Sequence, residues 1–239
     1  MRPTSQNFFQ TSDGARIYFE ESGSGRPILL VPGFLGTTRF FCRNTGPLSQ
    51  GHRVIVMDPR GQGFSSKTPG GNTVLRNARD IAELAEYLNL NDFLLLGWSL
   101  ASSVALVYAT DLDKGRLSGL ILVDGSLFPL SGEAWNKHRA RDYDVQNWMD
   151  TYLPLWQNPR EFYDRFVDRI SNGAMSPEDR AWVLAECQKT MPWTALELHY
   201  DFCHTDSFPG CPGSGFRWRS SAELPLHTDW KCWTRMPPR

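Results

Sequence analysis

The five residues from Gly97 to Ala101, Gly-Trp-Ser-Leu-Ala, have the types and spacing expected around a nucleophilic serine. They directly follow the apolar run 93–96 and directly precede 102–109, whose sequence favours a helix. A strand, a sharp turn with a central serine and a helix together form a nucleophile elbow. The turn strains the serine and needs small residues two positions to either side, as Gly97 and Ala101 are. The Ser99 hydroxyl would then stand at a helix N-terminus, which favours a developing anion. The alternative is an ordinary buried turn between a strand and a helix.

Composition narrows the classes of protein that this chain can belong to. Its 239 residues, 41% hydrophobic, are enough for one large α/β domain or two small ones. A net charge of −1 gives no general affinity for nucleic acid or for an anionic membrane. No apolar run approaches the length of a membrane span. Five scattered cysteines indicate a reduced, cytoplasmic protein rather than a disulfide scaffold.

Short apolar segments separated by helical patterns predict the elements that must position the serine. The predicted strands are 15–21, 28–31, 52–57, 93–96 and 120–123. Between two of them, residues 73–88 keep apolar side chains at helical spacing. Buried strands that alternate with helices predict an α/β fold with a mostly parallel sheet covered on both faces.

The pattern changes after Asp124, because residues from about 130 to 205 favour helices only. Helix starts are predicted at Asn158-Pro159 and at Ser176-Pro177. A helical insertion at this point predicts a cap over the carboxyl edge of the sheet, where such folds bind ligands. We therefore divide the chain into a core (1–126), a helical cap (127–205) and an atypical tail (206–239). Five tryptophans of the cap region either line an apolar pocket or form the cap's own core; they are Trp135, Trp148, Trp156, Trp182 and Trp193.

Three motifs that occur in a fixed order carry a family resemblance. They are Val31-Pro-Gly-Phe-Leu-Gly-Thr37, Asp58-Pro-Arg-Gly-Gln-Gly-Phe-Ser65 and the elbow around Ser99. With these, the chain resembles the α/β-hydrolase family over about residues 8–208. The likeness is closest to the branch of small esterases, cofactor-free haloperoxidases and carbon–carbon hydrolases.

The resemblance implies a role for several residues. Ser99 would attack an acyl carbon, and the backbone N–H groups of Phe34 and Leu100 would stabilise the oxyanion. Many members have His-Gly where this chain has Pro32-Gly33, but the donor is a backbone group that Phe34 still supplies. The side chains of Trp98, Phe34 and Trp135 would contact a small apolar acyl substrate, and no cofactor or metal is implied.

The family's acid and histidine normally follow its last strands, and the sequence shows no such strands. From Pro209 onward there is no apolar run, as a truncation or a shifted reading frame would produce. We expect a sheet that is short at its C-terminal edge, where an unpaired strand favours self-association. The candidate base is His227, which could equally be a solvated side chain of the tail. The candidate acid is Asp124, where some family members have one, although it could simply cap a turn.

Three other types of site fit less well. Gly61-Gln62-Gly63 follows a strand but lacks the third glycine of a dinucleotide loop. Some hydrolases of the same fold use an aspartate nucleophile, whereas this chain has serine at the corresponding position, Ser99. A zinc site would need residues at unsuitable intervals, namely Cys203, Cys211, His227 and Cys232.

The sequence therefore predicts a serine hydrolase of the carboxylic-ester type, acting on an ester, lactone or related acyl bond. The runner-up is a non-catalytic, hydrolase-like ligand-binding protein or a truncated, inactive product.

Overall fold

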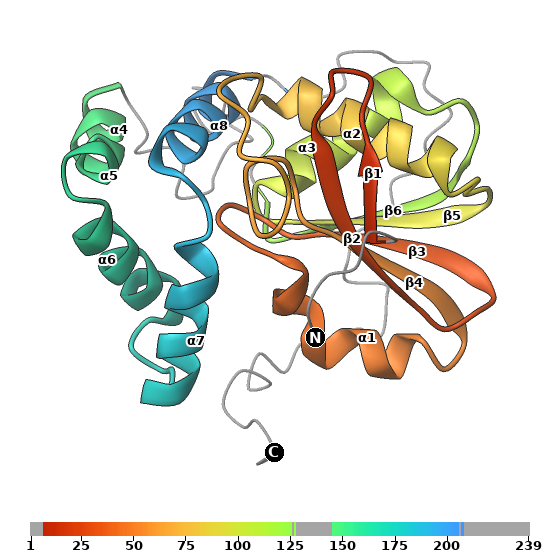
Figure 1. The fold of residues 1–239 in the computed structure, drawn as a ribbon, viewed down its shortest axis with the longest axis horizontal. Coiled ribbons are helices and arrows are strands. Elements are labelled where there is room, and N and C mark those ends of the chain that lie inside the picture. Colours follow the sequence, from red (N-terminus) through yellow and green to blue (C-terminus); the bar gives the residue numbers. More distant parts are fainter. Residues whose placement is uncertain (1–6, 126, 128–144, 206, 208–239) are drawn as a thin grey trace, which may run out of the picture.

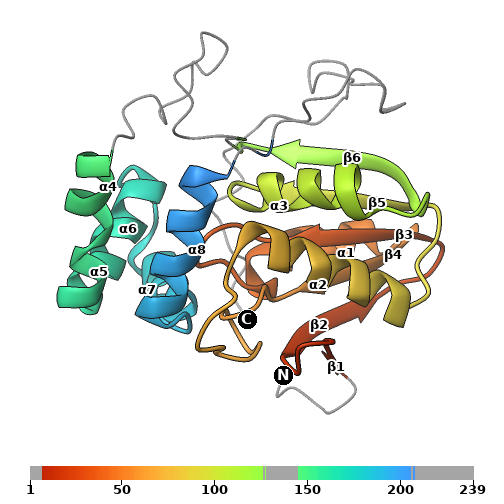
Figure 2. The same cartoon turned by 90° about the horizontal axis from the view of Figure 1, so that it is seen from above.

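The computed structural model describes residues 7–125, 127, 145–205 and 207. A six-stranded sheet crosses the molecule in the order β1-β2-β4-β3-β5-β6 (Figures 1 and 2). The strands are β1 (Phe8–Gln10), β2 (Arg16–Ser22), β3 (Arg26–Val31), β4 (His52–Met57), β5 (Phe93–Trp98) and β6 (Leu117–Val123). Each of the five predicted strands is present.

The sheet is parallel where the elbow forms. β3 pairs in parallel with both β4 and β5, and β5 pairs in parallel with β6. The antiparallel pairs are β1 with β2 and β2 with β4, on the far side of the sheet from β6. The carboxyl ends of β3, β5 and β6 therefore meet at one edge, which brings Gly33, Ser99 and Asp124 to the same side of the sheet.

Helices cover both faces of the sheet. The helices of the core are α1 (Cys42–Leu48), α2 (Val74–Tyr87) and α3 (Ala101–Val107). The α2 and α3 side chains share the larger core cluster with Leu29, Ile55 and Leu95. The neighbouring strand residues point to the opposite face of the sheet. There Ile28, Leu30, Val54 and Val56 form a second cluster with Phe41, near α1. Side chains that alternate between two buried faces explain why the strands are continuously apolar.

Five further helices of the described residues form a layer beside the sheet. They are α4 (Val145–Tyr152), α5 (Pro154–Gln157), α6 (Pro159–Ser171), α7 (Pro177–Cys187) and α8 (Pro192–His204). In both views α8 lies nearer the sheet than α4, α5 and α6 do (Figures 1 and 2). Asn158 and Ser176 cap α6 and α7 by accepting from the backbone N–H three residues on, as predicted.

The two ends of this helical layer meet. The backbone N–H of Ser207 donates to the carbonyl of Leu127 at 3.0 Å, so the chain leaves and returns at one place beyond β6. At its other side, α8 is fixed to the core because Asp201 accepts from the Val74 N–H at 2.7 Å. Glu197 accepts from the Gly71 N–H at 2.9 Å. The α8 helix is therefore held against the start of α2.

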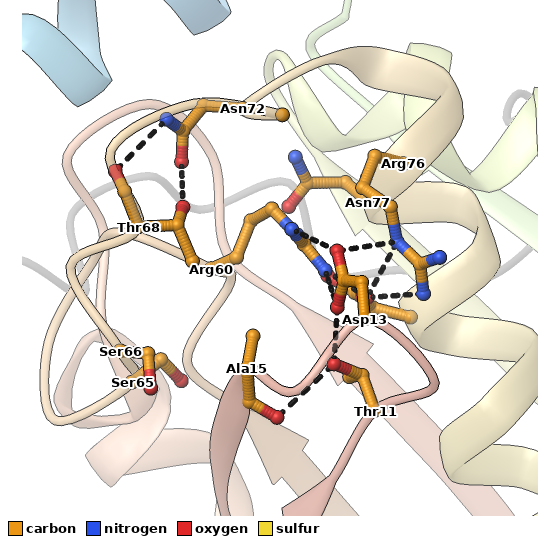
Figure 3. Close-up of polar contacts among 12 residues, drawn as sticks. Thr11, Asp13, Ala15, Arg60, Ser65, Ser66, Thr68, Asn72, Arg76 and Asn77 are labelled. Atoms are coloured by element: carbon orange, nitrogen blue, oxygen red, sulfur yellow. Dashed lines mark hydrogen bonds and ion pairs between the residues drawn. The ribbon is translucent and has the colours of Figure 1, made fainter.

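A buried ion-pair network joins the second sequence motif to α2. Arg60, with its side chain 1% exposed, donates to both oxygens of the fully buried Asp80, at 2.6 and 2.7 Å. It also donates to Asp13 of the β1–β2 turn (Figure 3). Arg76, one turn before Asp80 in α2, donates to the same carboxylate. Three separate segments are thus held together by one guanidinium group.

Within the described ranges β6 is the last strand of the sheet. The predicted absence of strands after residue 209 concerns residues outside those ranges, and self-association through the β6 edge stays a prediction. The division at residues 126 and 205 is likewise a prediction.

Candidate active site

The backbone at Ser99 has the strained shape that the elbow requires. Ser99 lies between β5 and α3 with a φ of +56°, a left-handed value that is uncommon outside glycine. Its N–H donates to the carbonyl of Val123 at 2.7 Å, and its own carbonyl accepts from the Ser102 N–H at 2.9 Å. These two hydrogen bonds, with Val123 and Ser102, fix the turn. Ser99 is half-buried and lies at the carboxyl edge of the sheet.

Two glycines leave room for this turn. A Cβ atom at Gly97 would lie 2.3 Å from the carbonyl oxygen of Ala101, which no real contact allows. A Cβ atom at Gly33 would lie 2.7 Å from the Ser99 Cβ and 3.3 Å from its Oγ. The loop after β3 thus passes directly against the Ser99 side chain.

Two backbone amides beside Ser99 are available as donors. In the part of the chain that the structure describes, neither the Phe34 N–H nor the Leu100 N–H has a hydrogen-bond acceptor. Leu100 precedes the first turn of α3, whose N–H groups lack partners within the helix. The Phe34 amide belongs to a tight turn, in which the Gly36 N–H donates to the Gly33 carbonyl at 3.0 Å. These are the two groups that the resemblance assigns to the oxyanion hole.

A small cavity lies behind the Leu100 side of the elbow. Its volume is about 10 Å³, which is room for one water molecule. Pro32, Gln62 and Leu198 are among its lining residues, and the buried Gln62 Oε1 has no partner among the described atoms. The cavity is too small for an ester.

Aromatic side chains of the helical layer cover the Phe34 ring. Its centroid lies 5.0 Å from that of His199, 5.7 Å from Phe166 and 6.1 Å from Tyr152. These three residues come from α8, α6 and α4. The wall next to the Ser99 loop is therefore aromatic.

His199 is the buried titratable group of this wall. Its Nδ1 accepts a hydrogen bond from the Trp148 Nε1 at 3.0 Å, so the neutral ring carries its proton on Nε2. Its ring stacks on Tyr152 with centroids 3.6 Å apart. Burial, with a smaller contribution from the Arg169 charge, lowers the pKa of His199 to about 3. The imidazole is therefore neutral near pH 7.

This pKa gives a prediction about stability at acid pH. An unfolded chain binds a proton at His199 below its ordinary pKa of 6.5, whereas the folded chain does not. The free energy of unfolding contributed by this site is present above pH 6.5 and is lost as pH falls towards 3, by up to about 1.4 kcal/mol per unit. We expect His199→Gln, which keeps an acceptor for Trp148, to flatten this dependence in urea unfolding between pH 4 and 7. The exposed His204 offers the matched control, since His204→Gln should leave the slope unchanged.

The other predicted site residues fall into two groups. The Trp98 ring lies 5.8 Å from Phe40 and 6.5 Å from Phe41, in the core, and its substrate role stays a prediction. Asp124 is exposed, directly follows β6, and has a φ of +49°. His227 and Trp135 lie outside the described residues. No histidine of the described ranges hydrogen-bonds to Ser99.

Among the residues that the structure describes, no three His, Cys, Asp or Glu side chains gather as a metal site would require. Of the four considered zinc ligands only Cys203 is described, and it is buried. No helix in the described ranges has the length and apolar character to cross a membrane. The predicted cytoplasmic location stays a prediction.

Comparison with known proteins identifies the family. The family model described as alpha/beta hydrolase fold matches residues 26–166, which include the loop after β3, the second motif and the elbow. The chain belongs to the α/β hydrolase fold family. The match covers more than half of the chain, and it confirms the resemblance and the fold class predicted from the three motifs.

Individual relatives of this α/β hydrolase have several activities in their names. The chain is similar to a non-heme haloperoxidase of Rhodococcus erythropolis, with 28% identity over 70% of this chain and 65% of the relative. It is similar to a proline iminopeptidase of Neisseria gonorrhoeae, with 25% identity over 84% and 65%. The chain therefore spans about two thirds of the length of these relatives.

Solved structures agree with the fold. An esterase from Exiguobacterium antarcticum superposes with a TM-score of 0.72 at 23% identity, covering 84% of this chain and 74% of that one. A thermophilic esterase from Thermogutta terrifontis gives a TM-score of 0.67 at 27% identity, covering 82% and 70%.

Proposed function

We propose that this chain is a serine hydrolase that acts on a carboxylic ester, lactone or related acyl bond. Two observations carry the proposal: the Ser99 turn lies against the loop after β3 at Gly33, and the amides of Phe34 and Leu100 in these two segments lack acceptors among the described residues. Attack by the Ser99 Oγ on an acyl carbon would place the developing oxyanion near these donors. Each such donor contributes roughly 2.7–4 kcal/mol to transition-state stabilisation in enzymes where it has been removed.

An apolar acyl group fits the surroundings of Ser99 best. The Phe34 ring and its neighbours Tyr152 and Phe166 present aromatic carbon to an acyl group. The Arg169 guanidinium lies over the Tyr152 and Phe166 rings, 6.0 and 5.5 Å from their centroids, where these rings already interact with its charge. Desolvating a carboxylate against such a wall would cost several kcal/mol unless it found a partner. We therefore propose small apolar acyl chains or aromatic esters as substrates, with Trp98 and Trp135 as further contacts.

The proposed general base is His227 and the proposed acid is Asp124. A serine hydroxyl needs such a base, because it stays protonated near neutral pH. If no histidine reaches Ser99, the oxyanion donors alone would leave about 10³–10⁴-fold acceleration over water. We accordingly expect slow turnover from this chain.

A fluorophosphonate probe tests the nucleophile directly. Ser99 should be labelled, as peptide mapping by mass spectrometry would show, and Ser99→Ala should lose at least about 99% of the labelling, since no other group replaces the Oγ. The matched control is Ser102→Ala, three residues on, whose Oγ donates to the Gly97 carbonyl at 3.0 Å instead of facing the edge. Equal labelling of wild type and Ser99→Ala would contradict the proposal.

A comparison of p-nitrophenyl butyrate with a succinate half-ester tests the substrate class. We expect the butyrate ester to have the higher kcat/KM by about tenfold or more, because the carboxylate must lose its water. The same assay on His227→Ala tests the proposed base, and robust turnover that survives this change, well above the residual level of the oxyanion donors alone, would transfer the role to another histidine.

A second candidate is a hydrolase-like protein that binds an apolar acyl ligand without cleaving it. The absence of a histidine bonded to Ser99 in the described ranges favours this alternative. Binding of a butyrate ester without labelling by the probe would support it.

A further inference from the structure

The loop that carries the Phe34 amide is held at its far end by two buried carboxylates. Asp58 follows β4, and Glu186 lies near the end of α7 in the helical layer. Both side chains reach the loop within two neighbouring residues, Thr37 and Thr38. These contacts decide where the loop lies relative to Ser99.

Asp58 connects the loop to the second sequence motif. Its Oδ1 accepts from the Thr38 N–H at 2.6 Å, and its Oδ2 accepts from the Phe64 N–H at 2.7 Å. A Cβ atom at Gly63 would lie 2.0 Å from the Asp58 carboxylate, so the turn is closed tightly around it. Although these donors favour the charged form, burial raises the pKa of Asp58 to about 6.

Glu186 makes the corresponding contact from α7. Its Oε2 accepts from the Thr37 hydroxyl at 2.8 Å, across 149 positions of sequence. Its side chain is only 6% exposed, and the Lys189 ammonium donates to both of its oxygens, at 2.7 and 2.8 Å. The charge of this carboxylate is therefore paired while its oxygen is directed at the loop.

The two carboxylates belong to one closed network. The Lys189 ammonium that pairs with Glu186 also lies over the Phe64 ring, 4.6 Å from its centroid. The N–H of the same Phe64 donates to Asp58. Contacts therefore run from Thr37 to Glu186, Lys189, Phe64 and Asp58, and from Asp58 back to Thr38. The α7 helix is thus connected to the loop both directly and through the second sequence motif.

We propose that Glu186 is a positioning residue, which through the Thr37 hydroxyl fixes the loop 33–38 and hence the Phe34 amide against Ser99. This inference rests on the proposed function for its catalytic consequence, but its structural part stands without it. The helical layer would then have a second role besides enclosing a substrate, because the position of α7 would set the position of the Phe34 amide relative to Ser99.

Hydrogen exchange of backbone amides tests the structural part without any substrate. The reporters are the Gly36 and Thr38 amides, which are bonded to Gly33 and Asp58. Glu186→Ala and Thr37→Val should each raise their exchange rates by about tenfold, and the double variant should exchange no faster than Glu186→Ala, since Glu186→Ala already removes the contact that Thr37→Val removes. Thr37→Val is nearly isosteric and keeps the experiment informative if Glu186→Ala unfolds.

Two control variants separate positioning from general loosening. Glu186→Gln keeps an acceptor for the Thr37 hydroxyl and should exchange like wild type. Glu197→Ala removes a different contact between the helical layer and the core, to the Gly71 N–H, and should speed exchange at Gly71 but not at Gly36. Unchanged exchange at Gly36 and Thr38 in Glu186→Ala, or equal rates in the Gln and Ala variants, would overturn the proposal.

Probe labelling of Ser99 tests the catalytic part. Thr37→Val and Glu186→Ala should lower the maximal labelling rate by about tenfold while half-saturation stays unchanged, because a misplaced donor weakens the transition state and not ground-state binding. A rise in half-saturation at an unchanged maximal rate would overturn the positioning role. If wild type is not labelled at all, the proposed function fails, and the exchange experiment alone decides whether Glu186 fixes the loop.

Discussion

Replacing Arg60 with methionine should lower the free energy of unfolding by about 3 to 5 kcal/mol. The reason is the partner that the substitution leaves behind. Asp80 is fully buried and receives two hydrogen bonds from the Arg60 guanidinium, so without it a carboxylate loses most of its compensation in the core. Arg76 would still reach one Asp80 oxygen, which keeps the loss within this range.

Urea unfolding of three variants checks this expectation. Arg60→Met and Asp80→Leu should each be costly, and the double variant should lose much less than the sum, because it leaves neither charge unpaired. Arg180→Ala provides the matched control, since its pairs with Asp164 and Asp168 are exposed to solvent and should contribute far less to stability. Additive losses in the double variant would show that the Arg60–Asp80 contact is not what stabilises this region.

The elements around Ser99 were predictable because each has a local cause. Continuous apolar runs such as 54–57 are buried on both faces, and the caps at Asn158 and Ser176 satisfy backbone groups three residues away. The strand order was not predictable from these signals. β3 lies between β4 and β5, and no local feature of any of the three strands records which one it will adjoin.

The candidate site divides in the same way. The turn at Ser99 and the amides of Phe34 and Leu100 could be predicted, since they belong to contiguous motifs. The contact from Glu186 to Thr37 could not, because it joins residues 149 positions apart that have no distinguishing neighbours. The burial of His199 could not be predicted either, since on α8 it is one polar residue among several, and residues distant in the sequence, such as Tyr152 and Phe34, help to enclose it.

Adding one methyl group at Gly97 should damage both stability and the elbow. In Gly97→Ala the new Cβ would lie 2.3 Å from the Ala101 carbonyl oxygen and 2.9 Å from the Ala105 Cβ. These atoms belong to the first turns of α3, and backbone cannot rotate away as a side chain can. Relief therefore requires α3 to move from β5, and we expect a loss of about 3 kcal/mol in the free energy of unfolding. Because Ser99 and Leu100 connect these two elements, probe labelling of Ser99 should fall with it.

Gly119→Ala in the neighbouring strand β6 is the control that isolates this cause. There the added Cβ would meet the Leu94 Cδ2 at 2.8 Å, the far end of a flexible side chain that can change its rotamer. We expect that variant to lose less than about 1 kcal/mol in thermal or urea unfolding and to label like wild type. Similar losses in the two variants would mean that the sheet resists any added side chain, and that the contact between Gly97 and α3 has no special part in forming the elbow. A large loss confined to Gly97→Ala would instead tie the stability of the β5–α3 junction to the same close approach that places Ser99 at the carboxyl edge of the sheet.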